Sequence, residues 1–117
     1  LYDECRKYIA HHMFERAAYI AVGDGGHNAT DLKPKAVDPT RMGLFHEIMR
    51  KPLREKVQED LFSITGSIRV EKTELNGAYI SEYLLLDVEG KPIGGKTSAP
   101  KIKESDEYYD FSVKVKF

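Results

Sequence analysis

Several groups of residues in this sequence could catalyse a reaction, and each of them is incomplete. His46-Glu47 begins like the helix of a zinc protease, but Arg50 stands where the second histidine ligand is required. His11 and His12 are adjacent, so on a helix they point about 100° apart and are poorly placed to share a metal ion. The single cysteine, Cys5, has no base signature that would make it a nucleophile. The sequence therefore favours a protein that is not an enzyme and that uses no metal or cofactor.

A glycine-rich turn and three nearby oxygen-bearing side chains could bind a phosphate or a calcium ion. The turn, Gly23-Asp24-Gly25-Gly26, lacks the Lys-Ser/Thr of a Walker loop and the spacing of a dinucleotide-binding fingerprint. Asp24, Asn28 and Asp31 have the spacing neither of an EF-hand loop nor of the calcium-binding nonapeptide repeat. We therefore interpret this segment as a tight turn in which glycine supplies positive φ angles.

The composition predicts one globular domain covering residues 1–117. A chain of 117 residues, 41% hydrophobic and 32% charged, has the size of a single core. Its 18 basic and 19 acidic residues give a formal charge of −1, which disfavours binding to nucleic acid or to an anionic membrane. No apolar run approaches the ~20 residues of a membrane span. Because the chain begins at Leu1 and enters a helical pattern at once, we expect it to be a segment of a longer polypeptide.

The first part of the chain predicts an amphipathic helix over about residues 1–17, followed by a β-rich body over about residues 18–117. Apolar residues recur at spacings of three and four, at Leu1, Cys5, Tyr8, Ile9, Met13 and Ala17. Residues 18–22 form a short apolar run that indicates a buried strand, and residues 27–40 form a polar, aperiodic stretch that indicates an exposed loop. The apolar positions of residues 44–50 fit either a short helix or a strand.

The second part of the chain indicates strands joined by short turns. Residues 62–70 alternate between apolar and polar side chains, with Gly66 marking a bulge or a close backbone approach. Residues 78–87 indicate a largely buried strand that forms a hairpin with residues 92–97, and residues 109–117 show the clearest alternation. One helix and about five strands predict a mainly β (α+β) fold, a small antiparallel sheet or sandwich with the helix packed on or beside it.

Three stretches of the chain are similar, in the same order, to motifs of a known family. Residues 18–26 are similar to a strand that ends in an "ALGDGG"-type turn. Asp38-Pro39-Thr40 followed by residues 44–53 is similar to "T-x-L-x-N-E-V-x-R-x-P". Residues 73–94 are similar to "E-x-N-G, I-x-E-x-G-L-F-D-x-x-G-x-L". Together these stretches resemble the N-terminal domain of bacteriophage tail fibre and tail-collar fibre proteins. The chain differs from that pattern at packing positions, His46, Tyr83 and Leu85.

The resemblance implies a structural protein of the virion, with no catalytic residues. Such a domain forms the base of a fibre, usually as a homotrimer, and attaches it to the tail tube or baseplate. The implied partners are further copies of the chain and other tail or baseplate proteins. The implied location is the tail of the virion, assembled in the host cytoplasm.

Long aperiodic loops and mixed apolar and basic segments often carry recognition, so we expect the protein contacts around residues 25–40 and 44–53. The candidate contact residues are Asp24, His27, Asn28, Asp31, Phe45, Arg50 and Arg54. The alternative function is a small carbohydrate- or receptor-binding β module, with tyrosines for stacking and Asp24, Asn28 and Asp31 for polar or calcium contacts. A hydrolase that uses His46 and Glu47 is the least favoured hypothesis.

Overall fold

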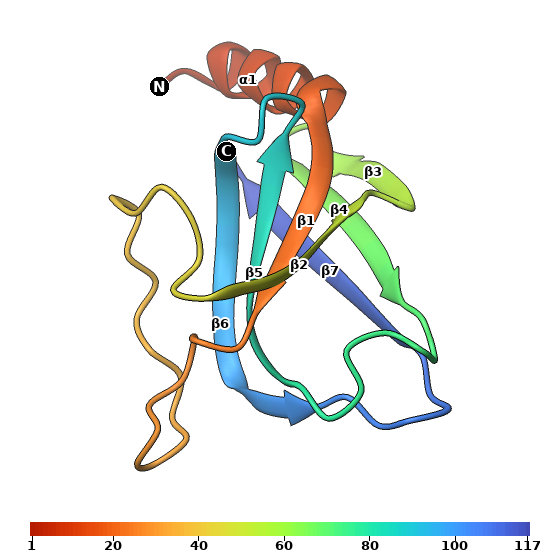
Figure 1. The fold of residues 1–117 in the computed structure, drawn as a ribbon. Helices are drawn as coiled ribbons and strands as arrows, with labels where there is room; N and C mark the ends of the chain where they lie inside the picture. Colours follow the sequence, from red (N-terminus) through yellow and green to blue (C-terminus); the bar gives the residue numbers. More distant parts are fainter.

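The computed structural model describes residues 1–117 as one helix and seven strands (Figure 1). The elements are α1 (Asp3–Arg16), β1 (Ala17–Gly23), β2 (Glu47–Pro52), β3 (Glu55–Asp60), β4 (Ser63–Val70), β5 (Tyr79–Asp87), β6 (Pro92–Ile102) and β7 (Tyr109–Lys116). The predicted mainly β fold with an N-terminal helix is confirmed.

The strands form two antiparallel sheets. One sheet has the order β2-β1-β5-β6 and the other has the order β3-β4-β7. Only Leu53 and Arg54 separate β2 from β3, so the chain passes directly from one sheet into the other. The backbone N–H of Leu53 donates to Ala18 in the first sheet, and that of Arg54 donates to Ser67 in the second. This short crossing joins the two sheets along one side of the sandwich.

The core lies between the sheets and is made by alternate residues of the central strands. Its fully buried members include Ile20 and Val22 on β1, Ile64 and Ile68 on β4, and Leu85 on β5. The alternation in residues 62–70 and 109–117 therefore identified the inward faces of β4 and β7 correctly.

Gly66 lies on the inward face of β4. Its pairing with β7 runs without a register shift, so the predicted bulge is absent. A Cβ atom at this position would lie 2.9 Å from the side chains of both Leu53 and Leu85. Glycine is therefore needed here because the packing is close.

The helix is present, but only part of its predicted apolar face is covered, namely Ile9, Met13 and Ala17. Ala10 is buried and Met13 packs partly against the core, whereas Leu1, Cys5 and Tyr8 are exposed to solvent. The physical reason is that α1 lies across one end of the sandwich and packs mainly against β3 and β4, so only one side of it is covered (Figure 1). Cys5 is thus a surface thiol and not a small core residue. At 14 residues, α1 is neither long nor apolar enough to cross a membrane.

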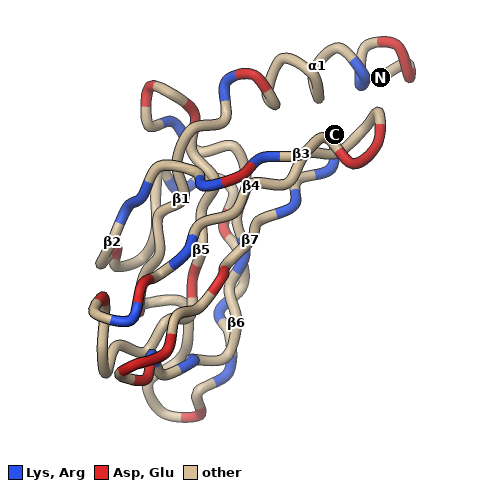
Figure 2. Tube along the Cα trace, turned by 90° about the vertical axis from the view of Figure 1, so that its right-hand side faces the viewer, with Lys and Arg blue, Asp and Glu red and all other residues tan.

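Two features of the strand pattern were not predicted. Residues 44–50, whose apolar positions fit either a helix or a strand, lead into the strand β2. The charged segment Glu55–Asp60 forms β3, which has no apolar alternation because it is an exposed edge strand held by backbone pairing with β4. The total is therefore seven strands and not about five. Acidic and basic positions are interspersed along the chain trace, consistent with the near-neutral net charge (Figure 2).

Candidate protein-contact surface

A long loop, residues 24–46, connects β1 to β2 and begins and ends at neighbouring positions, because these strands pair antiparallel. A carboxylate from β5 holds both ends of it. Glu82 is 1% exposed, and its Oε2 accepts hydrogen bonds from the backbone N–H of Gly25 at 2.9 Å and of His46 at 2.8 Å. Its Oε1 accepts from the backbone N–H of Phe45 at 2.7 Å. The buried charge is thus satisfied by three backbone donors, which fixes the base of the loop on the sheet.

The glycines of the Gly23-Asp24-Gly25-Gly26 turn are needed for close approach to β5. None of them has a positive φ angle, so the predicted role of these glycines is wrong. A Cβ atom on Gly26 would collide with the carbonyl oxygen of Ser81 and lie 2.8 Å from Cβ of Glu82. A Cβ atom on Gly25 would lie 3.0 Å from the Glu82 carboxylate. Side chains here would push the turn away from the carboxylate that binds it.

Further hydrogen bonds tie the start of the loop to the sheet. The buried hydroxyl of Ser81 accepts from the backbone N–H of Gly26 at 2.9 Å and lies 2.7 Å from Nδ1 of His27. His27 also forms an isolated bridge with Pro34. The hydroxyl of Thr97 on β6 donates to the carbonyl oxygen of Lys35. The predicted exposed loop is therefore confirmed, but it is a loop held at several points against the outer face of one sheet.

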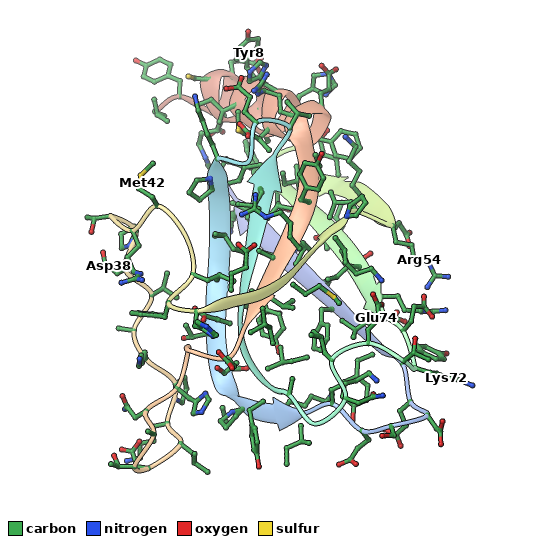
Figure 3. All side chains as sticks on the ribbon, viewed as in Figure 1. Tyr8, Asp38, Met42, Arg54, Lys72 and Glu74 are labelled. Carbon is green, nitrogen blue, oxygen red and sulfur yellow. The ribbon has the colours of Figure 1, made fainter.

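The outer part of the loop exposes both apolar and polar residues. Leu32, Val37 and Met42 are more than half exposed, with Met42 at 83%. Met42 projects from the loop, away from the sandwich (Figure 3). Two of the predicted contact residues, Asn28 and Asp31, are also exposed here. These residues are accessible to a partner at separate points along the loop.

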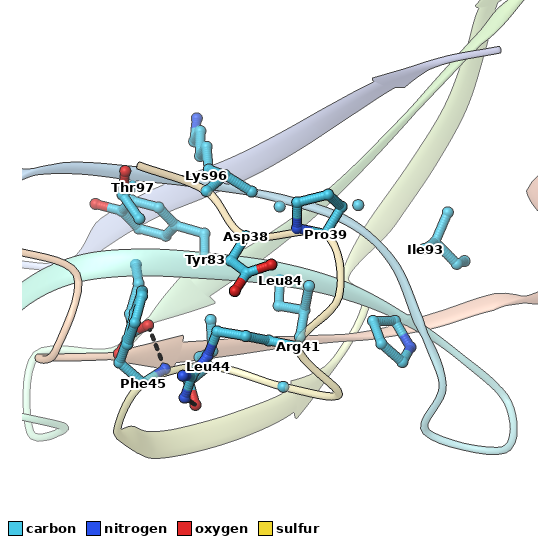
Figure 4. Close-up of a pocket in the computed structure, with 16 residues that line it drawn as sticks. Asp38, Pro39, Arg41, Leu44, Phe45, Tyr83, Leu84, Ile93, Lys96 and Thr97 are labelled. Carbon is cyan, nitrogen blue, oxygen red and sulfur yellow. Dashed lines mark hydrogen bonds between the residues drawn. The ribbon is translucent and has the colours of Figure 1, made fainter. Parts of the chain in front are cut away.

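A cavity of about 190 Å³ lies between the second half of the loop and the outer face of β5 and β6 (Figure 4). Leu84, Ile93 and Gly95 contribute from the two strands, and Arg41 and Phe45 contribute from the loop. The loop and the two strands also contribute the remaining lining residues: Val37, Asp38, Pro39, Gly43, Leu44, Glu82, Tyr83, Pro92, Gly94, Lys96 and Thr97. The cavity is thus a mainly apolar hollow under the loop.

Two cations flank the ring of Phe45 at this cavity. The ammonium of Lys35 lies 4.6 Å from the ring centroid and the guanidinium of Arg41 lies 4.1 Å from it. Arg41 also donates to the carbonyl oxygen of Leu44, and neither cation forms a salt bridge. Asp38 accepts two hydrogen bonds from Thr40, and these, together with the charge of Arg41, hold the pKa of Asp38 below its ordinary value.

Most, but not all, of the predicted contact residues belong to the long loop or to the strand that follows it. Asp24, His27, Asn28, Asp31 and Phe45 belong to the one loop. Arg50 follows on β2 and pairs with Glu47, so it lies on the same sheet. Arg54 lies on the side of the molecule away from Asp38 and Met42, where it reaches Asp110 of β7 at 3.8 Å (Figure 3).

The side chains considered for a hydrolase or a calcium site each bind a separate partner in the structure. Nδ1 of His46 pairs with the carboxylate of Asp24, whereas the carboxylate of Glu47 pairs with Arg50. His46 and Glu47 therefore do not converge on one catalytic centre, as the hydrolase hypothesis requires. Oδ1 of Asp31 accepts from the backbone N–H of Lys33, two residues along the chain. The side chains of Asp24 and Asp31 are thus engaged separately.

The residues that organise this surface were missed by sequence reasoning. Ser81 and Glu82 hold the loop, and Lys35 and Arg41 flank Phe45, yet none of these was singled out. The sequence does carry a signal for Ser81 and Glu82, because they are polar residues that interrupt the apolar run of a strand expected to be buried. Comparison of the chain with protein-family models and with curated protein sequences found no match.

Proposed function

We propose that this domain is a structural adaptor of a bacteriophage tail, which joins a fibre to the tail or baseplate through contacts with other proteins. One observation carries the proposal. The three stretches that resemble the tail fibre family meet at a single point, because Glu82 from the third stretch binds the backbone of Gly25 from the first and of Phe45 and His46 from the second. Residues that are far apart in the sequence pattern thus serve one structural purpose, which is to fix the long loop.

The way in which the loop is held supports a role in binding proteins. Loops fixed on a rigid scaffold lose less conformational entropy when a partner binds them. The base of this loop is held by Glu82 and Ser81, while its outer residues, such as Met42 and Val37, remain exposed. An adaptor needs this combination of a stiff base and an accessible surface. We expect the adaptor to be a homotrimer and to sit in the tail of the virion.

The arrangement of the tyrosines gives less support to a carbohydrate-binding module. Tyr8 is exposed on α1, whereas Tyr79 and Tyr108 are exposed at the opposite end of the sandwich. Tyr83 and Tyr109 pack against Phe111. A sugar site usually needs aromatic faces that converge on one groove, and these tyrosines are dispersed.

The test is to determine whether the chain is part of intact phage particles. Particles are purified from the source lysate on a density gradient, and their proteins are identified by mass spectrometry. We expect peptides of this chain at a fixed ratio to the major tail protein. Antibody-gold electron microscopy of the same particles should place label at the tail end or fibre root. Peptides that are present in the lysate but missing from purified particles would overturn the proposal.

A further inference from the structure

The turn that connects β4 to β5 contains the dipeptide Asn76-Gly77, which can react with itself. The backbone N–H of Ala78 donates to the carbonyl oxygen of Leu75 at 3.0 Å, so Asn76 and Gly77 are the two central residues of a tight turn. Gly77 has a φ of 82°, and both residues are exposed. Because glycine has no side chain, nothing hinders attack of its backbone nitrogen on the preceding asparagine amide. The turn thus places a nucleophile one residue from an electrophile.

The reaction open to this pair is deamidation through a succinimide. The backbone nitrogen of Gly77 loses its proton and forms a bond to Cγ of Asn76, and the side-chain amide leaves as ammonia. Water then opens the ring at either of its two carbonyl carbons, which produces aspartate or isoaspartate. One ammonia is lost and one water is gained, so the reaction needs no oxidant, reductant or cofactor. Isoaspartate lengthens the backbone of the turn by one carbon atom.

In the folded chain a single residue, Lys103, binds both reacting groups. Its backbone carbonyl oxygen accepts a hydrogen bond from the N–H of Gly77 at 2.8 Å, and its ammonium donates to Oδ1 of Asn76 at 2.9 Å. Lys103 is fully buried, and its own N–H donates to the carbonyl oxygen of Ala78 at 2.9 Å. A backbone N–H in a hydrogen bond gives up its proton mainly when that bond opens. The fold therefore keeps the nucleophile protonated and unreactive.

The ammonium of Lys103 also has an opposite effect on the reaction. By binding Oδ1 it polarises the amide of Asn76, and this alone would ease attack on Cγ. The same ammonium donates to the carbonyl oxygens of Lys72 and Glu104, at 3.4 Å and 3.0 Å, so it is fixed by three acceptors. A polarised amide does not react until the nitrogen of Gly77 is free. The restraint on the nucleophile therefore outweighs the polarisation.

We propose that Asn76 is a site of spontaneous deamidation, which Lys103 suppresses in the folded protein. The reaction proceeds in the fraction of molecules in which the hydrogen bond from Gly77 to Lys103 is open. Local opening thus leaves a permanent covalent change in the turn that joins the two sheets. This inference goes beyond the proposed function and is independent of it, because it rests only on the chemistry of the turn.

The rate of deamidation in the folded and the unfolded chain tests the proposal. The chain is incubated at neutral pH in buffer and in guanidinium chloride, and mass spectrometry of tryptic peptides follows the conversion of Asn76. We expect folding to slow this conversion at least ten-fold. Hydrogen exchange at the amide of Gly77 measures the open fraction, and the slowing of both processes should agree within about three-fold. Asn28, which Ala29 follows, is the internal control and should react slowly in both states.

Lys103→Met removes the ammonium, and Lys72→Met is the matched control at an exposed position. We expect Asn76 to deamidate at least five-fold faster in folded Lys103→Met than in the unmodified chain, and at the unmodified rate in Lys72→Met. Circular dichroism checks that each variant is folded. If Lys103→Met does not fold, the agreement between deamidation and hydrogen exchange in the unmodified chain decides. Equal rates in the folded and unfolded chain, a slowing that differs from that of exchange, or a folded Lys103→Met variant no faster than its control would overturn the inference.

Discussion

Phe45 and Glu82 are 37 residues apart in the sequence, yet the backbone N–H of Phe45 donates a 2.7 Å hydrogen bond to the carboxylate of Glu82. The same carboxylate accepts a hydrogen bond from Gly25, at the other end of the long loop. One side chain on β5 therefore determines where the loop leaves the sheet and where it returns. The exposed surface of the loop depends on this buried charge.

Replacing Glu82 with glutamine should loosen the loop. The glutamine amide nitrogen would face backbone N–H groups that also donate, so we expect the free energy of unfolding to fall by about 2–4 kcal/mol. Urea denaturation measures this change, and hydrogen exchange should show faster exchange at the amides of Gly25, Phe45 and His46. Glu71→Gln, at an exposed position whose side chain forms no salt bridge, serves as the control. Unchanged exchange at those three amides would contradict the role given to Glu82.

Gly26→Ala should destabilise the protein, whereas Gly43→Ala should not. The added Cβ at position 26 would collide with Ser81, and overpacking of this kind costs about 1–3 kcal/mol. At position 43 no atom lies within 4 Å of the added Cβ, so alanine should change stability by less than about 1 kcal/mol, in the stabilising direction. Thermal unfolding of the two variants, which carry the same substitution in one loop, provides the comparison. Equal losses of stability would disprove the close-approach argument.

Lys103→Met should destabilise the turn at Asn76. Lys103 is fully buried, and its ammonium donates to Oδ1 of Asn76 at 2.9 Å and to the carbonyl oxygens of Glu104 and Lys72. Methionine keeps much of the volume but leaves these acceptors without a donor, at a cost of about 2–3 kcal/mol. Lys72→Met, at an exposed position, should change the free energy of unfolding by less than about 0.5 kcal/mol. Chemical denaturation of both variants tests the difference, and a loss no greater than that of the control would refute it.

The stability of the protein should fall in acid partly because of Asp87. Burial alone would raise the pKa of Asp87, but hydrogen bonds from the backbone N–H groups of Lys91 and Glu89 and the charge of Arg16 outweigh it. The pKa is therefore lower in the folded than in the unfolded chain. The stabilisation is complete above the unfolded value of about 4 and is lost as the pH falls through the folded value.

Asp87→Asn should remove this part of the pH dependence. We expect the variant to be less stable than the unmodified protein at pH 7, by on the order of 1 kcal/mol, and the difference to shrink between about pH 5 and pH 2. Urea denaturation at a series of pH values measures it. A difference between Asp87→Asn and the unmodified protein that stays constant with pH would contradict the assignment.

The sequence by itself determined those elements whose side chains alternate in a regular way. Ile64, Ile68, Phe111 and Val113 face the core because strands place successive side chains on opposite faces, and this pattern can be read locally. The helix boundaries were also close, since helical spacing of apolar residues is a local signal. The edge strand β3 could not be found in this way, because its charged residues carry no pattern and its backbone pairing with β4 holds it in place.

Only the tertiary structure decided which side of α1 is covered and what holds the long loop. The helical spacing of apolar residues predicted that Cys5, Tyr8 and Met13 share one buried face. The end of the sandwich covers Met13 in part and leaves Cys5 and Tyr8 exposed. The roles of Gly26 and Glu82 depend on β5 passing beside the turn, more than 50 residues later in the chain. Contacts over such separations have no local signature in the sequence. Several polar residues could have bound the loop, and Glu82 does so because the strand order places it beside the turn.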